Sequence, residues 1–191
     1  TVGHGLDEAP DIVFYKSTGT TGDWYVWTTA IDGTDDYLKL NSTQAAAASS
    51  PANSLTATTI TNWNYSSSAS PVAYCFHSVE GFSKIGSYTG NGSADGPFIY
   101  TGFRPAFVLV KNTDAAEWWT LIDNKRVGYN ETNSILSPND GAAEYAAGSG
   151  GFDLTSNGFK VRGTSANFNG SSNTILYMAF AEMPFKYANA R

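Results

Sequence analysis

Aromatic side chains in a short strand-like segment are the first candidates for contact with a ligand. In residues 24–28, the alternation of a β-strand places Tyr25 and Trp27 on one face and Trp24 on the other. Aromatic rings beside polar groups can stack on a sugar, pack under a loop, or hold two domains or subunits together. We therefore expect Trp24 on the core face, whereas the role of Tyr25 and Trp27 stays open between a sugar platform and an interface.

A second segment with the same pattern adds further aromatic candidates. Trp119 and Leu121 fall on the face that is apolar in both segments, so Trp119 is predicted to be a core residue. Trp118 falls on the other face, and Trp63 lies in a stretch that is typical of a loop. The predicted ligand or interface residues are thus Tyr25, Trp27, Trp63 and Trp118.

No pattern in the chain predicts catalysis. A glycosidase needs two carboxyl groups at a set separation of roughly 5–10 Å. Acidic residues are present in number, but most stand beside Gly, Asn or Thr, as turn and cap residues do. These residues are Asp35, Asp36, Asp95, Asp114, Glu117 and Asp153. No Gly-x-Ser-x-Gly segment connects a strand to a helix. We therefore expect a protein that is not an enzyme, with a glycan-cleaving enzyme as a minor alternative.

The sequence offers little for a metal or a cofactor. It holds one cysteine, Cys75, and two histidines, His4 and His77, so a thiolate metal cage is excluded. The stretch 32–36 lacks the spacing of an EF-hand loop, and the glycine-containing stretch 90–96 has the wrong spacing for a dinucleotide loop. We expect no metal and no cofactor, structural roles for both histidines, and an inert buried thiol.

Composition and charge limit the partners. The net charge is −6, and only 15% of the residues are charged, so no basic stripe is available for nucleic acid. No apolar run approaches the ~20 residues that span a bilayer, and membrane insertion is not expected. Aromatic residues make up 14% of the chain, which indicates a folded protein.

Two copies of one pattern make up the chain. Residues 10–16 recur as residues 105–111 at an offset of 95, and Tyr74-Cys75-Phe76 matches Met178-Ala179-Phe180. The predicted repeats span residues 1–85 and 86–191. The second copy has a strand-like segment before its counterpart of His4-Gly5, whereas in the first only Thr1, Val2 and Gly3 precede His4. The first repeat is therefore expected to lack its leading strand, either through a cut or because another segment or chain completes that edge.

Local structure is predicted to be β nearly throughout. Strands are expected at residues 12–15, 24–28, 107–110, 159–162 and 175–180, because these runs are rich in β-branched and aromatic residues. Only the alanine-rich stretches 44–50 and 142–147 favour short helices. Short strands separated by frequent turns predict an all-β fold of two tandem antiparallel sandwiches of jelly-roll type.

Several segments carry a resemblance to a known family. The second half, with Gly86-Ser-Tyr-Thr-Gly-Asn-Gly92, Thr101-Gly-Phe-Arg-Pro105 and Tyr177-Met-Ala-Phe-Ala-Glu182, resembles a repeated module of tailed-phage virion proteins, often from marine phages. The first half resembles the upstream copy of that module. This resemblance implies a component of the virion surface, often in tail fibres, and brings no catalytic residues.

Two functional hypotheses follow from the residues and the resemblance together. The first is a non-enzymatic module of a phage tail fibre or spike that binds host-surface glycan or envelope, located on the extracellular virion surface. The alternative is a capsid decoration protein or a self-assembling sheath or filament subunit. Expected partners are other virion proteins, further copies of the chain and host glycan, but not nucleic acid.

Overall fold

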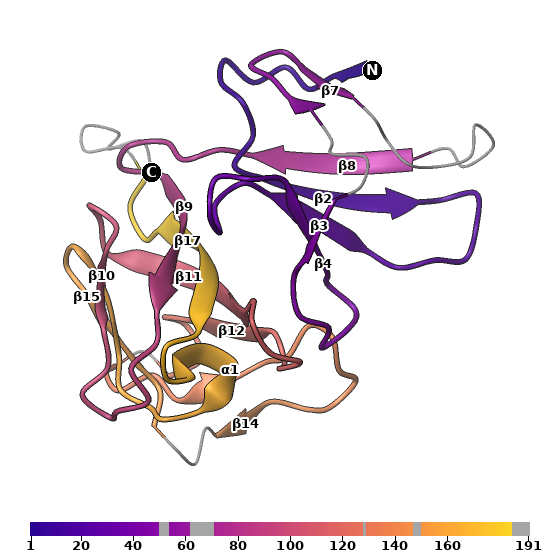
Figure 1. Ribbon diagram of the computed structural model, residues 1–191. Coiled ribbons are helices and arrows are strands. Elements are labelled where there is room, and N and C mark those ends of the chain that lie inside the picture. Colours follow the sequence, from indigo (N-terminus) through magenta and orange to yellow (C-terminus); the bar gives the residue numbers. More distant parts are fainter. Residues whose placement is uncertain (50–53, 62–70, 128, 147–149, 185–191) are drawn as a thin grey trace.

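The fold is all-β, as the sequence predicts. The computed structural model describes residues 1–49, 54–61, 71–127, 129–146 and 150–184. Within these ranges the strands form several antiparallel sheets, and the one helix, α1 (Ala166–Asn169), is a single turn capped by Ser165. The predicted sandwich class is therefore confirmed (Figure 1).

The first half forms one large sheet and one small sheet. We call the five-stranded sheet the first main sheet; its order is β5 (Ala47–Ala48), β4 (Asp36–Lys39), β3 (Tyr25–Thr28), β2 (Ile12–Ser17) and β8 (Pro71–Phe76). The small sheet, here the first cover sheet, has the order β1 (Val2–Gly3), β7 (Thr59–Thr61) and β6 (Ser54–Leu55).

The second half repeats this plan. The second main sheet has the order β12 (Thr120–Asp123), β11 (Pro105–Asn112), β17 (Thr174–Ala181) and β9 (Ser83–Thr89). The second cover sheet has the order β10 (Phe98–Tyr100), β16 (Gly158–Val161) and β15 (Phe152–Thr155). Between β12 and β15 in the sequence, β13 (Ser134–Ile135) and β14 (Tyr145–Ala146) pair with each other in a separate two-stranded sheet.

The two copies agree residue by residue in their strand pairing. Ile12 stands opposite Phe76 in the first main sheet, and at the same offset of 95 Phe107 stands opposite Phe180 in the second. Gly5 and Gly102, which precede β2 and β11, both adopt a positive φ (70° and 85°), a backbone conformation that glycine adopts without strain. The repeat found in the sequence is thus a repeat of structure.

The layers are held by three apolar clusters. One lies between the first main and cover sheets, a second between the two main sheets, and a third between the second main and cover sheets. The middle cluster joins the halves, because it includes Ile12 and Val26 from the first and Leu109 and Trp119 from the second. In Figure 1, β2 and β8 run across the upper part of the view whereas β9 and β17 run downwards, so the main sheets cross steeply.

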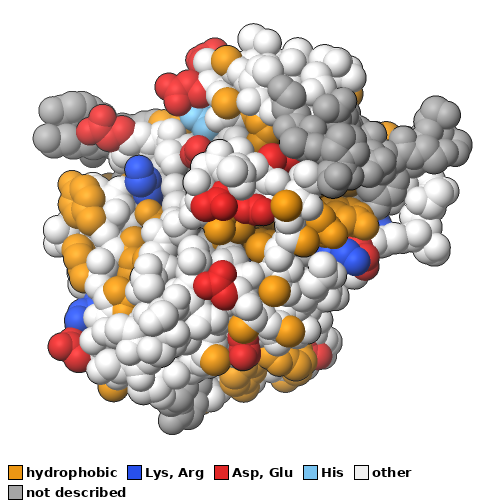
Figure 2. All heavy atoms as spheres, viewed as in Figure 1, with side chains coloured by type: hydrophobic (Ala, Val, Ile, Leu, Met, Phe, Trp, Pro, Cys, Tyr) orange, Lys and Arg blue, Asp and Glu red, His pale blue; other side chains and the backbone are white. Residues whose placement is uncertain are grey.

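Figure 2 shows the outer surface in the same view. A band of hydrophobic side chains crosses the middle of this face, and the Lys and Arg side chains are scattered singly. The first main sheet is covered on both faces, which explains why β2 is an almost unbroken apolar run rather than an alternating one.

The two predicted helices are wrong. As far as they are described, the stretches 44–50 and 142–147 contain strands instead, since β5 pairs with β4 and β14 pairs with β13. Alanine favours helix only weakly, and hydrogen bonding to an existing sheet edge outweighs that preference.

The predicted boundary between the repeats falls inside a strand. β9 begins at Ser83 and pairs with β17 over its whole length, so the residues just before position 86 belong to the second main sheet. The two halves also share the middle apolar cluster.

Candidate functional site

The outer edge of β8 is where the two halves differ most. In the second main sheet, β9 pairs along the outer side of β17. On the corresponding side of β8, no strand in the described ranges is paired. Val72 and Tyr74 of β8 are 41% and 51% exposed, which is unusual for large apolar residues of a main-sheet strand. This edge is the candidate site.

The backbone of β8 presents hydrogen-bonding groups outward. The backbone N–H of Asp11, the residue just before β2, donates to the carbonyl oxygen of Phe76 at 2.9 Å. The backbone carbonyl of Phe76 therefore points toward β2. Because the bonding direction alternates along an antiparallel strand, the N–H and C=O groups of Ala73 and Cys75 point to the outer edge. β8 carries no charged side chain, the common protection of an exposed edge, although it begins with Pro71.

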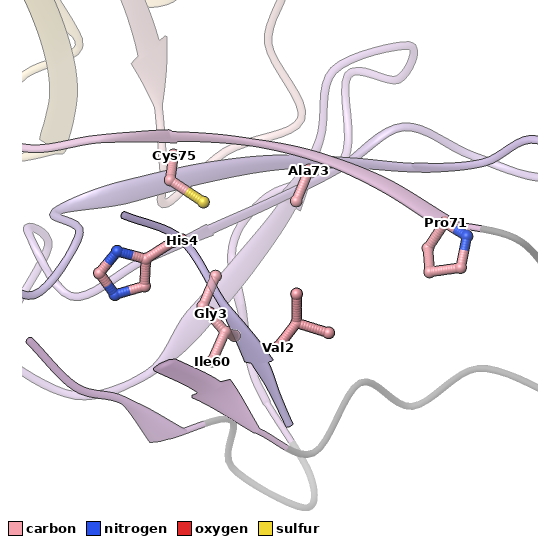
Figure 3. Close-up of a pocket in the computed structure, with 7 residues that line it drawn as sticks. All are labelled: Val2, Gly3, His4, Ile60, Pro71, Ala73 and Cys75. Carbon is pink, nitrogen blue, oxygen red and sulfur yellow. The ribbon is translucent and has the colours of Figure 1, made fainter. Parts of the chain in front are cut away.

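A groove lies on the cover-sheet side of this edge. It encloses about 250 Å³ and is lined by Val2, Gly3, His4, Ile60, Pro71, Ala73 and Cys75. Figure 3 shows the three β8 side chains reaching from their strand toward β1 and β7. The His4 ring is fixed at the end of the groove, since its Nδ1 accepts from Leu6 N (3.1 Å) and its Nε2 donates to Thr56 O (2.9 Å).

Beside this first groove, three aromatic rings of the second half have no aromatic counterparts in the described part of the first half. In the second half, Tyr177 packs between Phe159 and Tyr88, with ring centroids 5.6 and 6.3 Å away. The pairing registers place Ala73 at the position of Tyr177 and Ile60 at that of Phe159. Tyr88 belongs to β9, the strand that has no described equivalent on β8.

A second groove lies on the opposite face of β8, where the main sheets meet. It encloses about 290 Å³, and its lining side chains are all apolar or aromatic: Phe14, Trp24, Leu40, Tyr74, Phe76, Phe107, Leu109, Met178 and Phe180. The rings of Trp24 and Tyr74, which both line this groove, stack with centroids 6.4 Å apart. A strand added to β8 would therefore have an apolar groove for the side chains of each of its faces.

Comparison with known proteins gives a family without an assigned role. A family model described as a domain of unknown function, DUF7483, matches residues 1–184. The chain belongs to this family. No curated protein and no solved structure matches it. The matched range includes both copies of the repeat, so the DUF7483 domain comprises the pair of halves, with the β8 edge inside it.

Three of the four aromatic residues predicted for ligand contact can be placed in this DUF7483 domain. Trp27 is only 4% exposed and packs in the cluster under the first cover sheet, so a sugar-stacking role for it is wrong. Tyr25 is half-buried beside Trp27 and Tyr37, with Lys39 Nζ 5.7 Å from its ring centroid. The sequence argument assumed one core face on β3, but the cover sheet buries the second face as well.

Trp118 and Trp63 complete the predicted set. Trp118 is 40% exposed, so its side chain is accessible, and its backbone N–H donates to Asn167 Oδ1 at 3.3 Å. Trp63 lies outside the described residues. The predicted core position of Trp119 is confirmed, whereas Trp24 is only half-buried in the wall of the second groove.

Three of the six acidic residues that the sequence singled out have structural partners in the DUF7483 domain. Asp95 pairs with Lys160 (2.7 Å), Asp153 pairs with Arg162 (2.9 Å), and Asp114 Oδ2 accepts from Thr174 N (2.7 Å). In the part of the chain that the structure describes, no three His, Cys, Asp or Glu side chains gather as a metal site would require. None of the described helices is long and apolar enough to cross a membrane.

The single thiol is a minor feature of the first groove. Burial raises the pKa of the Cys75 thiol above its ordinary value, so the reactive thiolate is scarce near neutral pH. Sequence reasoning missed the residues that define the site, Val72, Ala73 and Tyr74. The signal that could have found them was the absent leading strand of the first repeat, read together with the uncharged β8.

Proposed function

We propose that this chain is a non-enzymatic structural module of a multi-copy surface assembly, joined to a neighbouring module through the open edge of β8. This corresponds to the alternative hypothesis of a decoration protein or a self-assembling subunit. The observation that carries it is the difference between β17, whose outer edge is paired with β9, and β8, whose outer edge pairs with no described strand.

Strand addition suits this edge on physical grounds. An added strand gains main-chain hydrogen bonds from the edge and specificity from pockets that receive alternate side chains. The outward N–H and C=O groups of Ala73 and Cys75 supply the main-chain hydrogen bonds, and the two grooves supply the pockets for side chains. An uncharged, partly apolar edge left in water would instead promote non-specific aggregation.

The connection between the halves suits a structural role. The middle apolar cluster is reinforced by hydrogen bonds from the second half to the first. Among them, Trp119 Nε1 donates to Lys39 O (2.9 Å), and Lys111 Nζ donates to Thr43 O (3.2 Å). A strand bound at β8 is therefore coupled to both halves as one packed unit.

The assembly we propose is the surface of a tailed-phage virion, with other virion proteins and further copies of the chain as partners. The support for this setting is the sequence resemblance alone. Gold-labelled antibody against the chain, imaged on intact particles, tests it. We expect label on the tail or on the capsid faces, and unlabelled particles would refute a virion location.

Binding of host glycan is a second candidate, favoured by one observation. Trp118 is 40% exposed, and the polar side chain of Asn167 accepts a hydrogen bond from its backbone N–H. A glycan array probed with the wild type and with Trp118→Ala tests this function. Loss of a wild-type signal in the variant would support it, and the absence of any wild-type signal would remove it.

Sedimentation velocity over a range of concentrations tests the assembly function. We expect the wild-type chain to associate as its concentration rises, and Val72→Lys to stay monomeric because it puts a charge on the uncharged edge. The matched control is Tyr100→Lys, the same kind of change at an exposed aromatic residue of β10. A monomeric wild type, or association of Val72→Lys equal to that of the wild type, would overturn the proposal.

A further inference from the structure

We infer that the strand which completes β8 has the direction and register of β9: it runs antiparallel to β8, with an aliphatic side chain opposite Tyr74 and a large apolar side chain opposite Ala73. This inference rests on the proposed function and names the partner of the same site. It follows from three observations on the second half, where such a strand is in place.

The first observation sets direction and register. β9 runs antiparallel to β17, with Lys84 opposite Ala179, Ile85 opposite Met178 and Gly86 opposite Tyr177. β8 and β17 occupy equivalent places, since Cys75 and Ala179 pair with equivalent residues of β2 and β11. The incoming strand therefore places its counterparts of Lys84, Ile85 and Gly86 opposite Cys75, Tyr74 and Ala73 in turn.

The second observation sets the side chain for the groove between the main sheets. Ile85 is buried in the middle apolar cluster. Its counterpart on the incoming strand, opposite Tyr74, shares the face of β8 that borders the second groove. An aliphatic residue at this position would bury its surface against Tyr74 and Phe76, whereas a charged residue would lose its hydration there.

The third observation sets the side chain for the groove under the cover sheet. Gly86 packs closely under Tyr177: a Cβ on it would lie 3.1 Å from that ring, so a larger residue would have to displace the ring. At the equivalent place β8 carries Ala73, which has no ring, and the first groove lies beside it. A glycine opposite Ala73 would leave this groove unfilled, so the incoming strand carries a large apolar residue there.

Pairing of β8 with β8 of a second copy fits less well. Centred on Ala73, that arrangement would set one Ala73 opposite the other and Pro71 opposite Cys75. Two alanines cannot fill the first groove, and Pro71 has no N–H to donate at the edge. The β9 of this chain is itself held in the second main sheet by seven residue pairs and carries Gly86 at the position opposite Ala73, so it is not the strand that completes β8.

Synthetic peptides of the segment 81–91 test the side-chain pattern by fluorescence anisotropy against the full chain. We expect the peptide with Gly86→Leu to bind at least tenfold more tightly than the unchanged peptide. A control peptide with Gly86→Leu but with Lys84 and Ile85 exchanged should bind weakly, because it presents the charge to the second groove. Equal affinity of all three peptides would overturn the inference.

Disulfide trapping on Cys75 tests the register. A Gly86→Leu peptide that also carries Lys84→Cys places its thiol opposite Cys75, within the Cα separation that a disulfide allows. The matched peptide with Ile85→Cys points its thiol to the other face of the strand. We expect trapping with the first peptide only, at mildly alkaline pH; equal trapping, or trapping with the second alone, would overturn the register.

The two proposals fail in different ways. If Val72→Lys abolishes self-association while none of the peptides binds, the edge joins modules through another kind of strand and only the inference is lost. If the Gly86→Leu peptide binds in the expected register but the wild type never associates, the β9-type acceptor site stands and the assembly function is lost.

Discussion

The indole Nε1 of Trp119 donates a hydrogen bond to the backbone carbonyl of Lys39 at 2.9 Å, so a core side chain of the second half is bonded to β4 of the first. Trp119 also packs in the apolar cluster between the two main sheets. Its counterpart in the first half, Trp24, is half-buried at the wall of a groove. Equivalent positions in the two copies thus differ in what they hold together.

Truncation of Trp119 should destabilise both halves together. We expect Trp119→Ala to lower the free energy of unfolding by about 3–5 kcal/mol, the usual cost of removing a large buried aromatic side chain. Urea unfolding followed by far-ultraviolet circular dichroism should remain a single transition at a lower midpoint. Two separated transitions in the wild type would show instead that the halves unfold independently.

Lys111 should make stability depend on pH. It is fully buried, its Nζ donates to the carbonyls of Thr43, Asn112 and Ala115, and desolvation lowers its pKa to about 8. Between pH 8 and the ordinary lysine pKa of 10.5, the unfolded chain holds a proton that the folded chain has released. The free energy of unfolding should therefore rise with pH through this window, by up to about 3 kcal/mol.

The control for this pH effect is the difference between variants. Lys111→Met should lose the rise between pH 8 and 10, whereas Lys16→Met, at the half-buried counterpart in β2, should keep it. Urea midpoints at half-unit steps from pH 7 to 10 measure both. If the free energy of unfolding of Lys111→Met rose with pH as steeply as that of the wild type, the pH effect would not come from Lys111.

Trp27 and Trp118 should respond oppositely to the same substitution. Trp27→Ala should cost about 3–5 kcal/mol because the ring is buried under the cover sheet. Trp118→Ala should change the free energy of unfolding by less than about 1 kcal/mol, since much of its ring faces solvent. Chemical unfolding of the two variants side by side is the measurement, and similar losses in both would refute these placements.

A ring added at Ala73 should fill the first groove from within. We expect Ala73→Phe to raise the free energy of unfolding by about 1–2 kcal/mol, because it restores a ring where the second half has Tyr177. It should also weaken binding of the Gly86→Leu peptide, which places leucine in the same space. Ala48→Phe, on the exposed end of β5, is the matched control and should give neither effect.

Much of the β structure could be predicted from the sequence because it is local in origin. Runs such as Ile12–Ser17 and Thr174–Ala181 are strand-forming in themselves, and the structure places strands there. The repeat offset of 95 also predicted which strands are equivalent, and the pairing registers agree with it residue by residue.

The candidate site could be predicted only in part. The sequence indicated that the first copy lacks a strand, which is the origin of the open edge. It did not indicate the grooves beside that edge, because these depend on Ala73 and Ile60, far apart in the chain, standing where the second half has Tyr177 and Phe159.

The sequence by itself determined the all-β class, the two copies and the strand that distinguishes them, since these depend on periodicity and on self-comparison. Only the tertiary structure decided which side chains are buried. Trp27 became a core residue and Trp24 a groove residue because a cover sheet and a second main sheet pack on opposite faces of β3. Alternation along one strand separates its two faces but carries no information about what packs against each.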